Sequence, residues 1–220
     1  MCGRISQAGD LADYVEAIGW TPSLLEDPVG PRYNVPPGTR PLAMHRMGDG
    51  DEKLDRLFWG YGPAKAQRTY SNAQLTALLK GDGFWQTLLQ RGRVIVPVDG
   101  WYEWVGERPN KQAWFVHAKN SAPVLLAGIS AWHPGYEHNK ERGMAIVTDD
   151  NAGGMIDVHD RRPIALSREH AAEWLDPKTS IDRARAILAA ARPESVFEWY
   201  RVTPAVGRSR YQRPVAIEPV

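Results

Sequence analysis

The stretch RVIVPVDGWYEWV, residues 93–105, predicts two neighbouring strands at the centre of the chain. Residues 93–98 and 101–105 are rich in β-branched and aromatic side chains, which favour strands. Asp99 and Gly100 stand between them, and this dipeptide favours a tight turn. We therefore predict that the two strands form a hairpin.

Alternation along the second strand places Glu103 on the same face as Trp101 and Val105, opposite Tyr102 and Trp104. A carboxylate among so many aromatic rings either faces solvent on an edge strand or lies in a partly dry pocket. In a dry pocket, desolvation raises the pKa of the carboxyl group and suits it to proton transfer. The sequence leaves both possibilities open.

The flanking sequence adds further strand and helix patterns. A Pro/Gly-rich stretch at 21–41 opposes both and predicts a long ordered loop. Asp10 and Ser167 are expected as N-caps of two helices. With no repeat, low-complexity tract or linker, these elements predict a single α+β domain over residues 1–220. We expect strands at 42–47, 53–59, 112–118, 123–130, 143–148, 196–202 and 214–218, and helices at 10–18, near 72–80, 83–90, 168–175 and 180–191.

The composition is that of an ordinary globular protein, with 43% hydrophobic and 24% charged residues in a chain of 220. A single cysteine excludes a disulfide framework and a cysteine-based zinc site, and agrees with a reducing compartment. The sequence has no signal-peptide pattern and no stretch long enough to span a bilayer, so we expect a cytoplasmic, nucleoid-associated protein. It contains no zinc-binding histidine spacing and no nucleotide-binding motif, which predicts no metal and no cofactor. We expect a monomer.

The net charge of +1 excludes a uniformly basic surface for nucleic acid, but the arginines are unevenly distributed. Pairs occur at positions 91 and 93 and at 161 and 162. Such runs are usually solvated faces. Most of the nine tryptophans are expected to anchor the core, although some could stack on bases. The segment 200–213 has no acidic residue and contains Arg201, Arg208, Arg210 and Arg213.

Cys2 follows Met1 and becomes the N-terminal residue if that methionine is removed, as small second residues generally permit. It then presents an α-amine beside a thiol. The amine titrates at about pH 7.7–8, so a useful fraction is neutral at physiological pH. A neutral amine condenses with an aldehyde to a Schiff base, which the thiol can close into a five-membered ring. Alternatively, the thiol is a nucleophile served by its own amine, or Cys2 is an incidental residue in a frayed terminus.

Two further residues are candidates for chemistry. Asn34 in GPRYNVPPG (30–38) is either a turn former that bonds its own backbone or a carboxamide presented by a rigid loop. His159 lies in IDVHDRRPIALS (156–167), where arginines favour the neutral imidazole and aspartates favour the charged one. It is a candidate general acid or base, the alternative being a structural histidine.

Six motifs follow one another from residue 2 to the C-terminus, and several are long and chemically unusual. Together they resemble the SOS-response-associated peptidase (SRAP) family. The motifs are MCGRISQ (1–7), RYNVPPGT (32–39), FWGYGP (58–63), VDGWYEW (98–104), IVTDDNAGGMIDVHDRRPIALS (146–167) and the AVG…IEPV tail (205–220).

The resemblance implies a fold of mostly antiparallel, curved sheets that form a barrel-like core with peripheral helices. It also implies autocatalytic loss of Met1 and reaction of Cys2 with abasic sites in single-stranded DNA. The open-chain sugar of an abasic site is an aldehyde, so the amine would form an imine and the thiol would close a thiazolidine. The resulting DNA–protein crosslink would shield the lesion from strand cleavage and error-prone bypass.

The family's active-site positions match Asn34, Glu103 and His159. By resemblance, Glu103 shuttles protons for the amine and thiol of Cys2, and His159 is a general acid and base at the sugar. Asn34 would orient the cysteine terminus or the sugar. A charge-dominated DNA interface, whose affinity falls with salt, is implied at Arg4, Pro37, Asn72, Gln74, Trp104, Thr148 and Arg161.

The chain departs from the family pattern in two places. Family members carry an arginine in the run Asn–Ala–Arg, whereas this chain has Gln74 after Asn72 and Ala73. Members often place adjacent tryptophans after FWGYGP, whereas residues 64–70 read AKAQRTY, whose basic and tyrosine side chains would substitute only in part.

Two other functions stay open. The chain could be an N-terminal-cysteine peptidase or amidohydrolase, or a non-catalytic module that binds single-stranded DNA.

Overall fold

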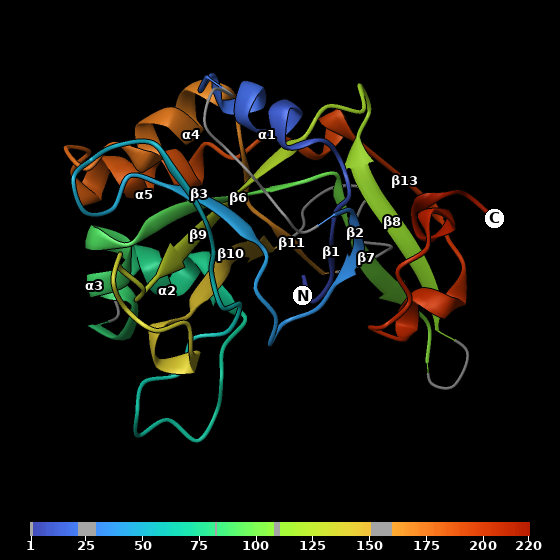
Figure 1. The fold of residues 1–220 in the computed structure, drawn as a ribbon, viewed down its shortest axis with the longest axis horizontal. Coiled ribbons are helices and arrows are strands. Elements are labelled where there is room, and N and C mark those ends of the chain that lie inside the picture. Colours follow the sequence, from blue (N-terminus) through green and yellow to red (C-terminus); the bar gives the residue numbers. More distant parts are fainter. Residues whose placement is uncertain (1, 22–29, 82, 108–110, 151–159) are drawn as a thin grey trace.

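Two facing β-sheets form the centre of the molecule in the computed structural model, which describes residues 2–21, 30–81, 83–107, 111–150 and 160–220 (Figure 1). Sheet A contains β1 (Ile5–Gln7), β2 (Arg32–Val35), β7 (Gly100–Val105), β8 (Gln112–Ala118) and β13 (Phe197–Arg201). Its spatial order is β13–β8–β7–β1–β2, and every pair is antiparallel.

Sheet B contains β3 (Leu42–His45), β4 (Lys53–Arg56), β5 (Asn72–Gln74), β6 (Arg93–Val98), β9 (Val124–Ser130), β10 (Met144–Asp150), β11 (Arg161–Pro163) and β12 (Ala165–Leu166). The main order is β11–β10–β9–β6–β3–β4, with β12 paired to β9 and β5 paired in parallel to β10. The predicted α+β class with mostly antiparallel sheets is therefore confirmed.

Alternating apolar residues divide the molecule into layers. On β6, Val94 and Val96 pack toward sheet A, in one cluster with Cys2 and Trp101. Ile95, one position away, packs in a separate cluster with the helices. A third cluster lies on the outer face of sheet A, where the C-terminal segment covers β7 and β8. Cys2 thus lies between the two sheets.

Helices cover the outer face of sheet B, on the side of the molecule opposite the C-terminal segment (Figure 1). Ser167 caps a helix as predicted, because its hydroxyl accepts from the backbone N–H of His170 at 3.2 Å. Asp10 occupies the N-cap position of α1 as predicted, but its side chain makes no capping hydrogen bond. No described helix is long and apolar enough to cross a bilayer. The helices are α1 (Leu11–Ile18), α2 (Leu75–Leu79), α3 (Gly83–Arg91), α4 (Arg168–Leu175) and α5 (Ile181–Ala189).

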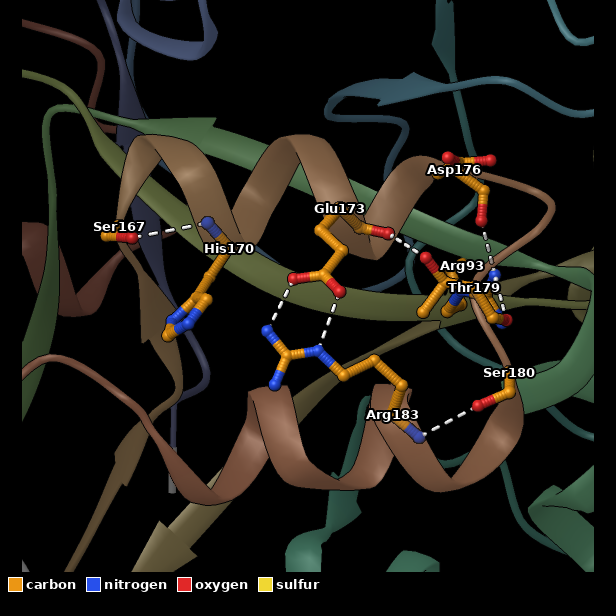
Figure 2. Close-up of polar contacts among 8 residues, drawn as sticks. All are labelled: Arg93, Ser167, His170, Glu173, Asp176, Thr179, Ser180 and Arg183. Atoms are coloured by element: carbon orange, nitrogen blue, oxygen red, sulfur yellow. Dashed lines mark hydrogen bonds and ion pairs between the residues drawn. The ribbon is translucent and has the colours of Figure 1, made fainter.

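Arg93 belongs to the interior rather than to a solvated basic face. Figure 2 shows its guanidinium beneath the end of α4, where it donates to the backbone carbonyls of Asp176 and Thr179 at 2.7 and 3.2 Å. Nearby, Arg183 of α5 makes two bonds of 2.6 Å to the carboxylate of Glu173 on α4. These contacts fasten both helices to sheet B and to each other.

The predicted hairpin at 93–105 is wrong, although both strands exist. β6 pairs with β3 and β9 in sheet B, whereas β7 pairs with β1 and β8 in sheet A. All six residues of β6 are buried, so this strand is covered on both faces and lies inside a sheet. Gly100 lets β7 approach β8 closely, since a Cβ there would clash with the carbonyl of Val116. Asp99 alone carries the chain from one sheet to the other.

Three other expectations are corrected. The resemblance implied a barrel-like core, but no ladder joins the edge strands of the two sheets among the residues described, and the sheets pack face to face instead. Residues 214–217 form a 3₁₀ turn rather than a strand, because Pro214 has no N–H for a ladder and fits a first helical turn. The expected helix near 72–80 begins only at Leu75, after the short strand β5.

Candidate active site

Cys2 is fully buried just before β1, the strand that lies between β2 and β7 in sheet A. Its thiol lies in the core between the sheets. Burial raises the pKa of this thiol, and the negative charge of Glu103 raises it further. The thiol is therefore held in its protonated form near neutral pH. Of the possibilities left open by the sequence, a frayed terminus is wrong for Cys2.

Glu103 lies on the face of β7 that carries Trp101, and is 2% exposed. The predicted alternation is confirmed, because Trp101 packs between the sheets while Tyr102 packs on the outer face. Desolvation, together with the nearby charge of Asp160, raises the pKa of Glu103 to about 8. Of the two environments considered for Glu103, the dry pocket is therefore the one observed.

Asn34 is buried in β2 and holds the strand that follows Cys2. Its side-chain oxygen accepts from the guanidinium of Arg4 at 2.6 Å. Its amide nitrogen donates to the carbonyls of Val206 and Arg208, both at 3.0 Å. Asn34 is thus not a local turn former; it joins the start of the chain to the C-terminal segment.

Arg4 is committed largely to contacts inside the protein. Besides Asn34, its guanidinium donates to the carbonyl of Val206 at 2.8 Å and lies 5.6 Å from the ring centre of Trp104. Burial lowers the pKa of Arg4 below its ordinary value. A DNA contact by Arg4 remains a prediction, and Trp104 is half-buried beside it.

Asn72 holds the backbone of Cys2. Its amide nitrogen donates to the carbonyl of Cys2 at 2.9 Å and to the hydroxyl of Ser71 at 3.1 Å. Its side-chain oxygen is buried and has no hydrogen-bond partner among the described residues. Asn72 was assigned to DNA binding by resemblance, and its contact with Cys2 was not predicted, because 70 positions separate the two residues.

Gln74, Thr148 and Arg161 meet where β5 and β11 flank β10. Register pairs Thr148 with Gln74 and with Pro163. The side-chain amide of Gln74 lies against the guanidinium of Arg161, 2.8 Å from Nη2, and its oxygen is assigned as the acceptor because that orientation satisfies both groups. Arg161 also contacts Asp150 at 3.3 Å. The hydroxyl of Thr148 is buried and lacks a partner within the described part of the chain.

Pro37 and His159 are the remaining predicted site residues. Pro37 is half-buried in the turn after β2, where the hydroxyl of Thr39 donates to the carbonyl of Pro36 at 2.7 Å. His159 lies outside the described residues.

Asp99 is a further residue that sequence reasoning missed. Its carboxylate accepts from the hydroxyls of Ser6 and Tyr14 at 2.6 and 2.5 Å. It also accepts from the backbone N–H groups of Ala8 and Gly9 at 2.7 and 3.1 Å. The link between the two sheets therefore also fixes the far end of β1. An acidic residue in a predicted turn gave no signal of this role.

Relatives of known name cover the whole chain. Abasic site processing protein YedK of Escherichia coli is 35% identical over 226 residues, with full coverage of both chains. Abasic site processing protein YoqW of Bacillus subtilis is 30% identical and covers 99% of each chain.

A solved structure agrees with the fold. The crystal structure of a phage-related protein from Bordetella bronchiseptica has a TM-score of 0.86 and 48% sequence identity, and the match covers 97% of this chain and all of the other. The sequence profile of the family described as SOS response associated peptidase (SRAP) matches residues 1–209. The chain therefore belongs to the SRAP family.

Proposed function

We propose that this protein forms a covalent crosslink with abasic sites in single-stranded DNA through Cys2 after removal of Met1. The observation that carries the proposal is the pairing of an aminothiol residue with a buried carboxyl group whose pKa is raised to about 8. Such a group is partly ionised near physiological pH and can both accept and donate a proton. The names of the curated relatives support the choice of an abasic site as the substrate.

The reaction begins at the amine. Burial raises the pKa of the thiol, so few Cys2 side chains are thiolates near neutral pH. The α-amine of a free terminus, by contrast, is partly neutral at this pH. The amine adds to the open-chain aldehyde and loses water, which gives an imine. The thiol then adds to the imine carbon and its proton passes to the nitrogen, which closes the thiazolidine ring.

Each polar neighbour has a distinct part in this scheme. Glu103 accepts the proton that the amine loses and supplies a proton to the departing water. Asn72 fixes the carbonyl of Cys2, and Asn34 fixes Arg4 two residues further on. By resemblance to the family, His159 opens the sugar ring and assists the reverse reaction.

The experiment is an assay of abasic single-stranded DNA on a denaturing gel, together with the intact mass of the protein. We expect a protein mass short of one methionine and an adduct that survives denaturation. Cys2→Ala should abolish the adduct, and borohydride-reduced abasic DNA, which has no aldehyde, should not react with the wild type. An adduct that persists in Cys2→Ala would overturn the proposal.

A Cys2→Ser variant separates the two reactive groups. It retains the amine but closes the ring poorly, so we expect an imine that is captured only when borohydride is added. Cleavage of peptide substrates by the wild type, without any DNA adduct, would instead indicate an N-terminal-cysteine peptidase. We propose that Met1 is removed autocatalytically, as the family resemblance implies.

A further inference from the structure

The segment after β13 presents a concentrated positive charge beside the candidate active site. Arg208, Arg210 and Arg213 are all exposed, and within the described residues none of them forms an ion pair with a carboxylate. No acidic residue occurs from position 200 to position 217. We call residues 208–213 the arginine loop.

The arginine loop is attached directly to Asn34. The carbonyls of Val206 and Arg208 accept from its side-chain amide. Gln212 binds its backbone twice, accepting from the N–H at 3.2 Å and donating to the carbonyl at 2.8 Å. These hydrogen bonds fix the position of the arginine loop against a buried asparagine. A loop that served only as a solvated surface would not need to be held in this way.

Aromatic side chains accompany the charges. Tyr33, Trp104 and Tyr211 are half-buried and pack in the cluster on the outer face of sheet A, beside the arginine loop. Proteins that bind single strands combine basic grooves with aromatic platforms for the bases. In Figure 1 the C-terminal segment lies beside β8 and β13, on the side of the molecule away from α3 and α5.

We propose that the arginine loop is a second phosphate-contacting surface, which holds the backbone of single-stranded DNA on the sheet A side of Cys2. This inference rests on the proposed function for the identity of its ligand. Arg161 and Gln74 lie on the sheet B side, where the family's usual arginine is missing. The arginine loop supplies positive charge on the other side, so a strand that reaches Cys2 is held from two directions.

The test compares salt dependence of binding to an unmodified single-stranded oligonucleotide, which cannot form a crosslink. The variant is Arg208→Gln/Arg210→Gln/Arg213→Gln. Each lost phosphate contact reduces the slope of log affinity against log salt by about 0.7, so we expect a reduction of about 2. The bonds to Asn34 use backbone carbonyls and Gln212, so the substitutions leave them in place.

A matched control removes three exposed cations near the helices, in Lys80→Gln/Arg168→Gln/Lys178→Gln, and should leave the slope unchanged. Replacement of the three loop arginines by lysine should keep most of the slope, because charge rather than shape is required. A loop variant with the wild-type slope, or a control with an equal reduction, would overturn the proposal.

Failure here is distinguishable from failure of the proposed function. A wild type that binds single strands with the loop-dependent slope but never forms the adduct leaves this surface intact and refutes the crosslinking activity. A wild type that forms the adduct while the loop variant keeps its slope refutes only the surface.

Discussion

Cys2 lies between a wall formed by sheet A and a wall formed by sheet B. Glu103 and Asn34 on the sheet A wall are less exposed than Gln74 and Arg161 on the sheet B wall. On the sheet A wall, Glu103 and Asn34 are 2% and 0% exposed. On the sheet B wall, Gln74 is exposed and the side chain of Arg161 is 28% exposed. Ionisation is costly in the first environment and easy in the second. Of these residues, the carboxyl group proposed for proton transfer is buried and the two residues proposed to contact DNA from sheet B are more exposed, so substitutions should separate reaction rate from affinity.

The largest expected effect after loss of Cys2 itself is that of Glu103→Gln. The amide keeps the shape but cannot accept a proton, so crosslinking at saturating abasic DNA should slow by about 10²–10⁴-fold. Single-turnover rates measure the effect, with Glu107→Gln as a control at an exposed carboxylate. If Glu103→Gln weakened DNA binding but left the rate unchanged, the proposed role of Glu103 in proton transfer would be contradicted.

Asn72→Ala sharpens the comparison, because Asn72 comes from sheet B but contacts Cys2. Loss of its bond to the carbonyl of Cys2 frees the reactive residue, and misplacement of this kind can cost up to about 100-fold in rate. We expect the rate to fall while the salt slope is unchanged, with Asn120→Ala on an exposed loop as the control. A changed slope at constant rate would make Asn72 a DNA contact instead.

The buried state of Glu103 also predicts how stability depends on pH. Its pKa is about 8 in the fold and about 4.3 in an unfolded chain, so between these values the folded protein binds more protons. The free energy of unfolding should therefore fall as pH rises, by up to about 1.4 kcal/mol per pH unit from this group. Urea denaturation from pH 5 to pH 8 should show wild type losing stability relative to Glu103→Gln. Parallel curves would rule out the raised pKa.

The smallest effect is expected for Gln74→Arg on the sheet B wall. The new cation adds a phosphate contact but removes the acceptor that Arg161 now uses. The slope of log affinity against log salt should steepen by at most about 0.7, with no change in rate at saturating DNA. Thr76→Arg adds the same charge at an exposed position of α2 and should have less effect. Equal slopes for both variants would show that position 74 does not face DNA.

The longer strands and the five helices could be predicted from local patterns, but the pairing of the strands could not. Local patterns also missed the short strands β1, β2, β5, β11 and β12, and β2 lies in the Pro/Gly-rich stretch that was predicted to be a loop. Alternation along β7 placed Glu103 correctly, because period-two burial is a local property. The dipeptide Asp99-Gly100 also favours a hairpin by a local pattern. In the structure, however, the carboxylate of Asp99 binds the segment around β1, and β6 and β7 belong to different sheets.

The contacts of the candidate site escape local reasoning for the same reason. Asn72 and Asn34 contact Cys2 and Arg208 across 70 and 174 positions. The residues next to Asn72 and Asn34 in the sequence therefore do not predict these partners. The family resemblance implied that Asn34 belongs to the active site, but only the fold shows that it binds Arg4 and the C-terminal segment.

The bond between Arg4 and the carbonyl of Val206, 202 positions apart, has a consequence for biosynthesis. At about 5–20 residues per second, Val206 leaves the ribosome roughly 10–40 s after Arg4. Throughout that interval Asn34 has no carbonyls to bind and the first strand has no complete sheet. Cys2 is thus enclosed only after Val206 has emerged, and chemistry that needs the finished site must wait until then.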